Sequence, residues 1–338
     1  MNIIQQPDAF CFSSALKDII IESDADVAVT FQAAGETFLT EAYTPDNENR
    51  IYIRDLAKLF VGYIPKTTLR ANFTITLTPA GATAQTINTT VLYGMAEIDI
   101  PAADFLAGRF LTLLPEEKIT YAGQREFLSL YPSEQTTVIA KAHRLSGTQE
   151  TKNVVINTLN QIATVDVSPA ALFNNPEQIS YYVIIAGNRH FTFYVKPVLP
   201  PEYIQFLFLN AFGVKETFIP AAITTRENKY DNKFGQFSGR YRKYQAEVVK
   251  NYTANTGVLT GPMADWLEDL FLSKDVFLLT GSGIEKEIVI EESTVKRSTA
   301  PDELPAFEFK YRLSKFNQHE YSLSKNRIFD DTFDYTFD

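Results

Sequence analysis

The feature that most constrains the fold is a period-two alternation of large apolar residues with small or polar ones. It runs from Val27 to Phe31, from Phe73 to Leu77 and from Phe307 to Leu313. Successive side chains of a β-strand point to opposite faces of its sheet, so this spacing is typical of strands with one buried and one solvated face. Gly35 and the Pro79 to Gly81 cluster lie between such segments as turn signals. The chain is therefore predicted to be mainly β.

The order of elements in the first region is repeated before residue 200. Strands lead to a short helical turn from Asp55 to Phe60, and a second set of strands leads to another turn from Ser168 to Phe173. We predict two tandem β-sandwich domains of the immunoglobulin-like kind, with short helical turns, over residues 1–120 and 121–199. The second is expected to be a duplication of the first, and two unrelated sandwiches with convergent turns are the alternative.

A proline-rich joint from Lys196 to Pro201 separates these domains from a third, which we expect over residues 200–338. The stretch from Tyr203 to Phe212 is almost continuously apolar, which indicates a strand covered on both faces. The stretch from Arg226 to Gly239 is polar and contains glycine, so we expect a loop or a hairpin tip there. The third domain is thus predicted to be β-rich, with one amphipathic helix over residues 262–273 and an acidic, aromatic tail.

Three agreeing signals predict that helix. Thr260 or Gly261 can cap it, Pro262 suits its first position, and apolar residues then recur three and four apart. A helix of about three turns is unstable alone in water, so its apolar face is expected to pack on the sheet of the third domain. The apolar face comprises Met263, Trp266, Leu267, Leu270 and Phe271, and the face expected to be solvated comprises Asp265, Glu268 and Asp269.

Composition excludes several classes of function. The 338 residues carry a net charge of −10, which argues against a binder of nucleic acid or of anionic membrane, since both attract basic surfaces. Cys11 is the only cysteine, so the chain can form no intrachain disulfide and no thiolate metal site. The stretch from Met1 to Phe12 has no basic residue and no long apolar run, unlike a secretory signal. We therefore expect the protein to be cytoplasmic when synthesised and to leave the cytoplasm only if something larger carries it out.

Side chains that could carry chemistry are sparse. His143, His190 and His319 lie in three separate regions, and no two histidines have the spacing of metal ligands. The stretch from Arg240 to Tyr244 interleaves basic and aromatic residues like a stacking and phosphate site, but the acidic balance of the chain argues against that interpretation. No metal, cofactor or catalytic residue is predicted, and we expect the protein not to be an enzyme.

Several stretches after the proline-rich joint carry a resemblance to a known family. They are Tyr203 to Gly213 with Phe218, Arg240 to Lys250, Met263 to Ser273, Val276 to Leu279, Phe307 to Leu313 and Asp330 to Asp338. Their order resembles the carboxy-terminal domain of tail-associated structural proteins encoded in prophages of gut Bacteroidetes. The resemblance implies no active site. It implies a non-catalytic structural or assembly protein, such as a phage-tail-like or prophage-encoded virion component.

Aromatic residues are frequent, and several lie in the carboxy-terminal tail, where no core is available to bury them. Since aromatic side chains are enriched at the centres of protein interfaces, we predict that the tail contacts a partner. That partner is another protein subunit of an assembly or a second copy of the chain, and a disordered end without a partner is the alternative. The alternative function is a carbohydrate-binding or adhesin-like surface module whose exposed aromatics bind a glycan. The candidate partner-contact residues are Phe329, Phe333, Tyr335 and Phe337.

Overall fold

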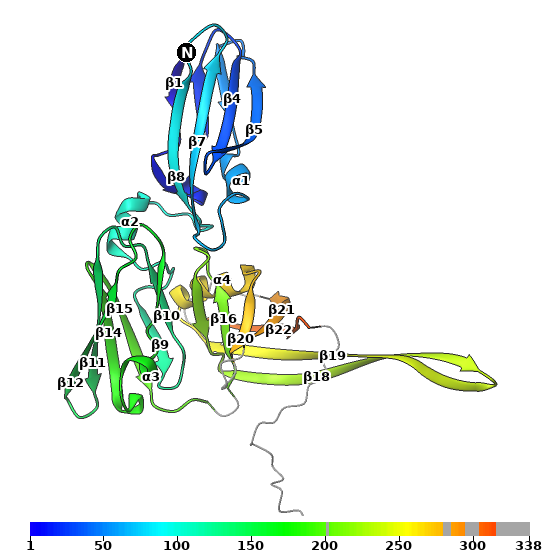
Figure 1. Ribbon diagram of the computed structural model, residues 1–338. Helices are drawn as coiled ribbons and strands as arrows, with labels where there is room; N and C mark the ends of the chain where they lie inside the picture. Colours follow the sequence, from blue (N-terminus) through cyan, green and yellow to red (C-terminus); the bar gives the residue numbers. More distant parts are fainter. Residues whose placement is uncertain (201–202, 280–284, 295–303, 316–338) are drawn as a thin grey trace, which may run out of the picture.

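The computed structural model describes residues 1–200, 203–279, 285–294 and 304–315. Figure 1 shows a first sandwich at the top, a second sandwich beside a seven-stranded sheet below it, and a long two-stranded arm that projects from that sheet. The prediction of a mainly β protein with tandem sandwiches and a β-rich third domain is confirmed. The immunoglobulin-like assignment of the sandwiches stays a prediction.

The first sandwich consists of eight strands and a short helix. The elements are β1 (Asn2–Gln5), β2 (Phe10–Phe12), the 3₁₀ turn η1 (Ser13–Ala15), β3 (Ile19–Glu22), β4 (Val27–Ala33), β5 (Glu36–Tyr43), β6 (Arg50–Ile53), α1 (Leu56–Val61), β7 (Arg70–Pro79) and β8 (Gln85–Leu92). A three-stranded sheet, β1-β3-β6, packs against a five-stranded sheet, β2-β8-β7-β4-β5. Val27, Val29 and Phe31 are all buried in this core, as their alternation predicts. Phe60 of α1 stacks on Phe73 with ring centroids 4.0 Å apart, so the helix belongs to the same core.

The second sandwich follows helix α2 (Ala102–Gly108). The elements are β9 (Glu117–Tyr121), β10 (Phe127–Leu130), β11 (Thr136–Arg144), β12 (Gln149–Ile156), β13 (Ala163–Asp166), α3 (Pro169–Leu172), the 3₁₀ turn η2 (Pro176–Gln178), β14 (Ile179–Ala186) and β15 (Arg189–Lys196). Its sheets are ordered β12-β11-β14-β15-β9 and β10-β13. Because β9 pairs with β15, the second sandwich begins no later than residue 117, and the boundary expected at residue 120 falls inside β9.

Seven strands of the first sandwich have the same order and pairing as the seven of the second, and β1 has no counterpart. Each five-stranded sheet contains one parallel pair, formed by its first and last strands in chain order, β2 with β8 and β9 with β15. The antiparallel run β8-β7-β4-β5 corresponds to β15-β14-β11-β12, and the pair β3-β6 corresponds to β10-β13. The helical turns also lie at equivalent places, α1 between β6 and β7 and α3 between β13 and β14. Origin by duplication stays a prediction, and this shared topology supports it.

The third domain is built on the seven-stranded sheet. The elements are β16 (Gln205–Leu209), β17 (Lys215–Phe218), β18 (Ala222–Phe237), β19 (Arg240–Val258), α4 (Gly261–Leu272), β20 (Val276–Leu279), β21 (Glu285–Thr294) and β22 (Ala306–Leu313), and the sheet order is β17-β16-β20-β21-β22-β19-β18. Residues 226–237 continue strand β18, so a loop there was the wrong prediction, whereas the hairpin tip lies at Ser238 and Gly239. The exposed residues of this strand lack the apolar period by which buried strands are recognised.

Helix α4 covers one face of that sheet, within one residue of the predicted bounds. Thr260 caps the helix, because its side chain accepts a hydrogen bond from the backbone nitrogen of Met263 at 3.4 Å. Trp266 is completely buried, with ring centroids 5.6 Å from Phe208 and 6.2 Å from Phe218. The prediction that Trp266 is a core residue packed on the sheet is therefore confirmed.

The opposite face of the sheet rests on the second sandwich. Gln205 Nε2 and Thr217 Oγ1 both donate to the backbone carbonyl of Arg125, at 2.6 and 2.7 Å. Strand β16 is thus covered on both faces, as its continuous apolar sequence predicts. The second sandwich and the third domain share one hydrophobic core, so the proline-rich joint connects two parts that are packed together.

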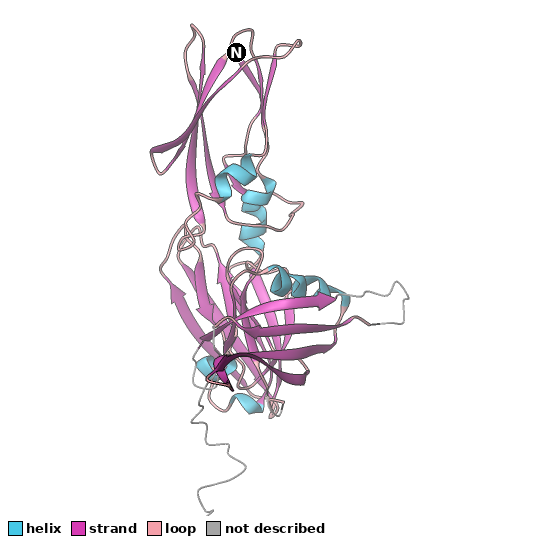
Figure 2. Ribbon diagram, turned by 90° about the vertical axis from the view of Figure 1, so that its right-hand side faces the viewer, coloured by secondary structure: helices cyan, strands magenta, loops and turns pink. Residues whose placement is uncertain are grey.

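Phe212 lies where all three parts meet. Its ring centroid is 5.5 Å from that of Phe12 in the first sandwich and 5.4 Å from that of Phe105 in α2. The neighbouring backbone nitrogen of Ala211 donates to Asp269 Oδ2 at 2.9 Å. Asp269 is buried by this contact, so its expected place on the solvated helix face was wrong. Figure 2 shows helices close to the level at which the first sandwich meets the rest of the chain.

Candidate functional site

The most distinctive surface is the arm formed by the outer parts of β18 and β19, which we define as residues 226–250 (Figure 1). Ser238 and Gly239 form a two-residue turn, and their φ angles of 52° and 74° are those of a hairpin turn that matches strand twist. Strand β19 pairs with β22 only from Asn251 onward, so the arm itself is two-stranded over its whole length. An isolated two-stranded hairpin is at best marginally stable in water.

Strand register divides the arm into two faces. Phe234 pairs with Lys243 and Gln236 with Tyr241, so Phe234 and Tyr241 share a face with Tyr230, which lies four residues before Phe234 on the same strand. We call this the aromatic face. The exposed fractions of its three rings are 64% for Tyr230, 60% for Phe234 and 79% for Tyr241. Exposed rings at this density are typical of a surface that another molecule covers.

The alternate positions form the opposite face, which we call the basic face. Its charged residues include Lys229, Asp231, Lys233, Arg240 and Arg242, whereas Lys243 lies on the aromatic face opposite Phe234. A β-bulge at Tyr244 places that ring over Gly235, where an added Cβ atom would lie 3.5 Å from Tyr244 Cδ1. The arm as a whole has seven basic and three acidic residues, a net charge of +4, so the rest of the chain carries −14. The arm is therefore a positively charged projection on an acidic protein.

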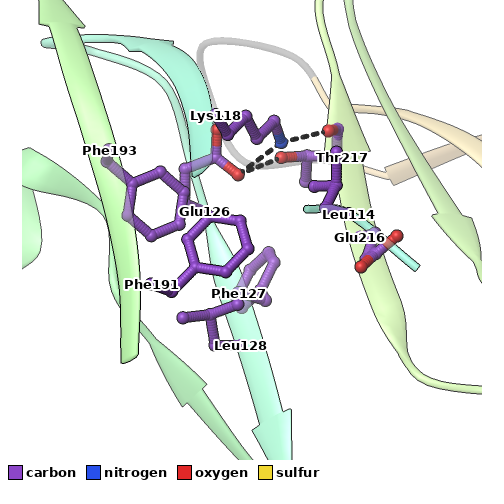
Figure 3. Close-up of a pocket in the computed structure, with 9 residues that line it drawn as sticks. All are labelled: Leu114, Lys118, Glu126, Phe127, Leu128, Phe191, Phe193, Glu216 and Thr217. Carbon is purple, nitrogen blue, oxygen red and sulfur yellow. Dashed lines mark hydrogen bonds and ion pairs between the residues drawn. The ribbon is translucent and has the colours of Figure 1, made fainter. Parts of the chain in front are cut away.

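A buried ion pair fastens the second sandwich to the third domain (Figure 3). Lys118 Nζ lies 2.7 Å from Glu126 Oε2 and donates to the backbone carbonyl of Thr217 at 2.6 Å. Thr217 Oγ1, which donates to the Arg125 carbonyl, also lies within hydrogen-bond distance of the same oxygen of Glu126, at 2.9 Å. The side chains of Lys118 and Glu126 are only 5% and 2% exposed, and the adjoining cavity of about 10 Å³ has room for at most one water. We name this cluster, with Glu216 and Trp266, the clamp.

Glu216 is the perturbed titratable group of the clamp. Burial raises the pKa of its carboxyl from 4.5 to about 7, against the opposing effect of hydrogen bonds from Thr112 and Trp266 and of the charge on Lys118. Burial also raises the pKa of Asp269. A carboxyl that titrates near neutrality occurs in catalytic sites and in structural networks. Here the carboxylate accepts the indole N–H of the core residue Trp266, so we assign it to the clamp.

A row of side chains crosses the outer face of the second sandwich. His143 pairs with Tyr181, Tyr181 with Tyr194, and Tyr194 with Ile119, each on a neighbouring strand. The rings of His143 and Tyr181 stack at 4.3 Å, and the centroids of Tyr181 and Tyr194 are 6.2 Å apart. Tyr194 and Ile119 are 46% and 47% exposed. We call this row the sheet platform.

The residues predicted from the sequence fall in different places. The candidate partner-contact residues Phe329, Phe333, Tyr335 and Phe337 lie outside the described residues. The basic and aromatic stretch from Arg240 to Tyr244, which the net charge argued against as a phosphate site, forms one strand of the arm tip. Sequence analysis missed the clamp, because Lys118 and Glu126 meet Glu216 and Thr217 from a distant part of the chain, and each charged residue resembles an ordinary surface charge.

Comparisons with known proteins do not assign the chain to a family. No family model matches the chain, and no curated protein matches it. A solved structure of SGBP-B from the mixed-linkage glucan utilization locus of Bacteroides ovatus, in complex with a mixed-linkage heptasaccharide, is similar over 89% of this chain and 75% of that one. The identity is 12% and the TM-score 0.17, which does not establish a shared fold. Among the described residues, no helix has the length and apolar character needed to cross a bilayer.

Proposed function

We propose that this chain is a non-catalytic subunit of a protein assembly and that the arm is its main contact with a neighbouring subunit. The observation that carries the proposal is a two-stranded arm with three strongly exposed rings on one face and a net charge of +4. Aromatic and arginine residues are the types most enriched at interface centres. A contact on the arm would cover these rings and supply the packing that a lone hairpin lacks.

The base of the arm is firmly connected to the rest of the protein, so a contact on the arm would hold the whole chain. Strand β19 continues from the arm into the seven-stranded sheet, where Ala254 is buried and pairs with Phe309. The clamp then fastens this sheet to the second sandwich through Lys118 and Glu126. Breaking a buried ion pair by removing one partner is costly, so the joint resists opening. The arm is therefore carried on a rigid base rather than on a flexible loop.

The kind of assembly that we propose is a phage tail or related prophage-encoded virion. The resemblance of residues 203–338 to tail-associated structural proteins supports this class, and so does the acidic, soluble composition of the chain outside the arm. A protein of this class is cytoplasmic when synthesised and is then built into a particle. Tail and portal genes beside this gene would support the class, and a flanking set of glycan-utilisation genes would contradict it.

The test is removal of the arm without disturbance of the body. Replacing Lys229–Val249 by Asn-Gly joins Asn228 to Lys250, which are paired neighbours, through a turn that suits a hairpin. The full chain and the shortened chain are expressed with the flanking genes, and the sedimenting particle fraction is compared. We expect the shortened chain to fold with an unchanged melting temperature and to be absent from particles.

A matched control substitutes exposed apolar residues elsewhere. Leu145→Ser with Val155→Ser removes two side chains that are 70% and 55% exposed on the second sandwich, and this variant should enter particles normally. If the arm-deleted chain sediments with particles as the full chain does, the arm is not the assembly contact and the proposal fails.

The sheet platform favours a second candidate function, the binding of a glycan. Planar rings such as Tyr181 and Tyr194 provide flat apolar surfaces, and the two are neighbours on an exposed sheet face. Screening the full chain against a glycan panel tests this function, with Tyr181→Ala and Tyr194→Ala as variants. Glycan binding that both substitutions abolish would replace the assembly proposal, and no binding by the unchanged chain would remove this candidate.

A further inference from the structure

We propose that the arm binds residues 328–338 of a second copy of this chain, which add to the outer edge of β18 as a further β-strand. This inference rests on the proposed function, since it names the partner of the same surface. Within the described part of the chain, β18 is the last strand of the sheet and no strand pairs with its outer edge. An exposed edge is a template for strand addition, and lysines such as Lys229 and Lys233 keep such an edge from pairing unselectively.

Length and charge match between the two partners. Residues 227–237 of the outer strand and residues 328–338 both comprise eleven positions, each about 36 Å long when extended. The arm carries a net charge of +4, and residues 328–338 contain four aspartates and no basic residue. The two segments are thus complementary in charge and similar in reach.

The alternation of side chains matches as well. In an extended segment, Phe329, Phe333, Tyr335 and Phe337 would share one face with Asp331, and Asp330, Asp334 and Asp338 would share the other. On the arm, Tyr230 and Phe234 belong to the aromatic face, and Lys229 and Lys233 belong to the basic face. A strand added along β18 can therefore place rings beside rings and aspartates beside lysines at the same time.

The second copy follows from the proposed role in assembly. The arm points away from its own body (Figure 1), and a contact that joins subunits must be made between chains. The contact would join two different surfaces, the arm of one copy and the carboxy-terminal segment of the next. Such head-to-tail contacts build rings or filaments rather than closed pairs.

The first experiment measures the contact directly. A fluorescein-labelled peptide of residues 326–338 is titrated with the chain truncated after Arg327, and binding is followed by fluorescence anisotropy. We expect saturable binding that weakens with added salt and falls at least about tenfold in the variant Lys229→Glu with Lys233→Glu. A peptide carrying Asp330→Lys and Asp334→Lys should recover binding to that variant.

Two controls separate this contact from general attraction between opposite charges. The variant Lys141→Glu with Lys152→Glu makes the same change of charge on the second sandwich and should leave binding unchanged. A peptide of the same composition, in which rings and aspartates no longer alternate, should bind at least about tenfold more weakly. Equal binding of the alternating and scrambled peptides, or no binding of either, overturns the inference.

The second experiment identifies the source of the segment. The full chain should self-associate as its concentration rises in analytical ultracentrifugation, and the truncated chain and the Lys229→Glu, Lys233→Glu chain should each remain monomeric. An equimolar mixture of these two variants should associate, because one supplies the arm and the other the segment. A full chain that stays monomeric, while the truncated chain binds the peptide, shows a contact within one chain and overturns the inference. Failure of the proposed function has a different sign, the entry of the arm-deleted chain into particles.

Discussion

Replacement of Glu216 by glutamine should make the third domain more stable at alkaline pH. Burial raises the pKa of this carboxyl to about 7 in the folded chain, whereas the unfolded chain has the ordinary value of 4.5. Below pH 4.5 both states hold the proton, and the stabilising effect of the proton is fully present. As the pH rises toward 7, the unfolded chain releases the proton first, so the free energy of unfolding decreases.

The size of the change in the free energy of unfolding follows from the pKa shift of Glu216. One pKa unit corresponds to about 1.4 kcal/mol, so this group alone should remove about 3 kcal/mol of stability between pH 4.5 and pH 8. Glutamine has no proton to lose, and its side-chain oxygen can still accept the N–H of Trp266. The Glu216→Gln variant should therefore match the unchanged chain near pH 4.5 and exceed it by up to about 3 kcal/mol at pH 8.

The assay is urea unfolding at a series of pH values, followed by the fluorescence of Trp266. Trp266 is the only tryptophan and lies against Glu216, so the signal reports on this part of the protein. The variant Glu48→Gln, at a side chain that is 73% exposed, is the control and should follow the unchanged chain. A stability difference between Glu216→Gln and the unchanged chain that is constant with pH, or that grows toward acid pH, would refute the reasoning.

Three further substitutions test the core and the joints. Trp266→Ala should lower the free energy of unfolding by about 3 to 5 kcal/mol in denaturant titrations followed by circular dichroism, and a loss below about 1 kcal/mol would contradict its central packing. Phe212→Ala should lower the free energy of unfolding by a similar amount. It should also increase hydrogen exchange in β2 and in α2, which the Phe212 ring contacts. Unchanged exchange in these two elements would show that Phe212 does not hold the junction. Lys118→Met alone should lower the free energy of unfolding by about 3 to 5 kcal/mol, because it leaves Glu126 buried without its ion-pair partner. Adding Glu126→Leu should recover most of this loss. A double variant as unstable as the single one would contradict this explanation.

Much of the fold could be predicted because its signals are local. The spacing of Val27, Val29 and Phe31 reports which face of one strand is buried, whatever sheet that strand joins. The cap at Thr260 and the position of Trp266 likewise depend on residues within one helix and the face it presents. The arm was only half predicted, since exposed strands carry no apolar period, and the turn at Gly239 was its one clear signal.

What the sequence by itself determined is the class of the protein: strands with one buried face, one capped helix, and an acidic chain with a basic, aromatic stretch from Arg240 to Tyr244. Only the tertiary structure decided that this stretch projects into solvent, that Asp269 is buried, and that Lys118 and Glu126 are buried against the distant residue Thr217. The physical reason is distance along the chain. Burial and charge pairing are set by residues that fold together from far apart, and a local pattern does not contain those partners.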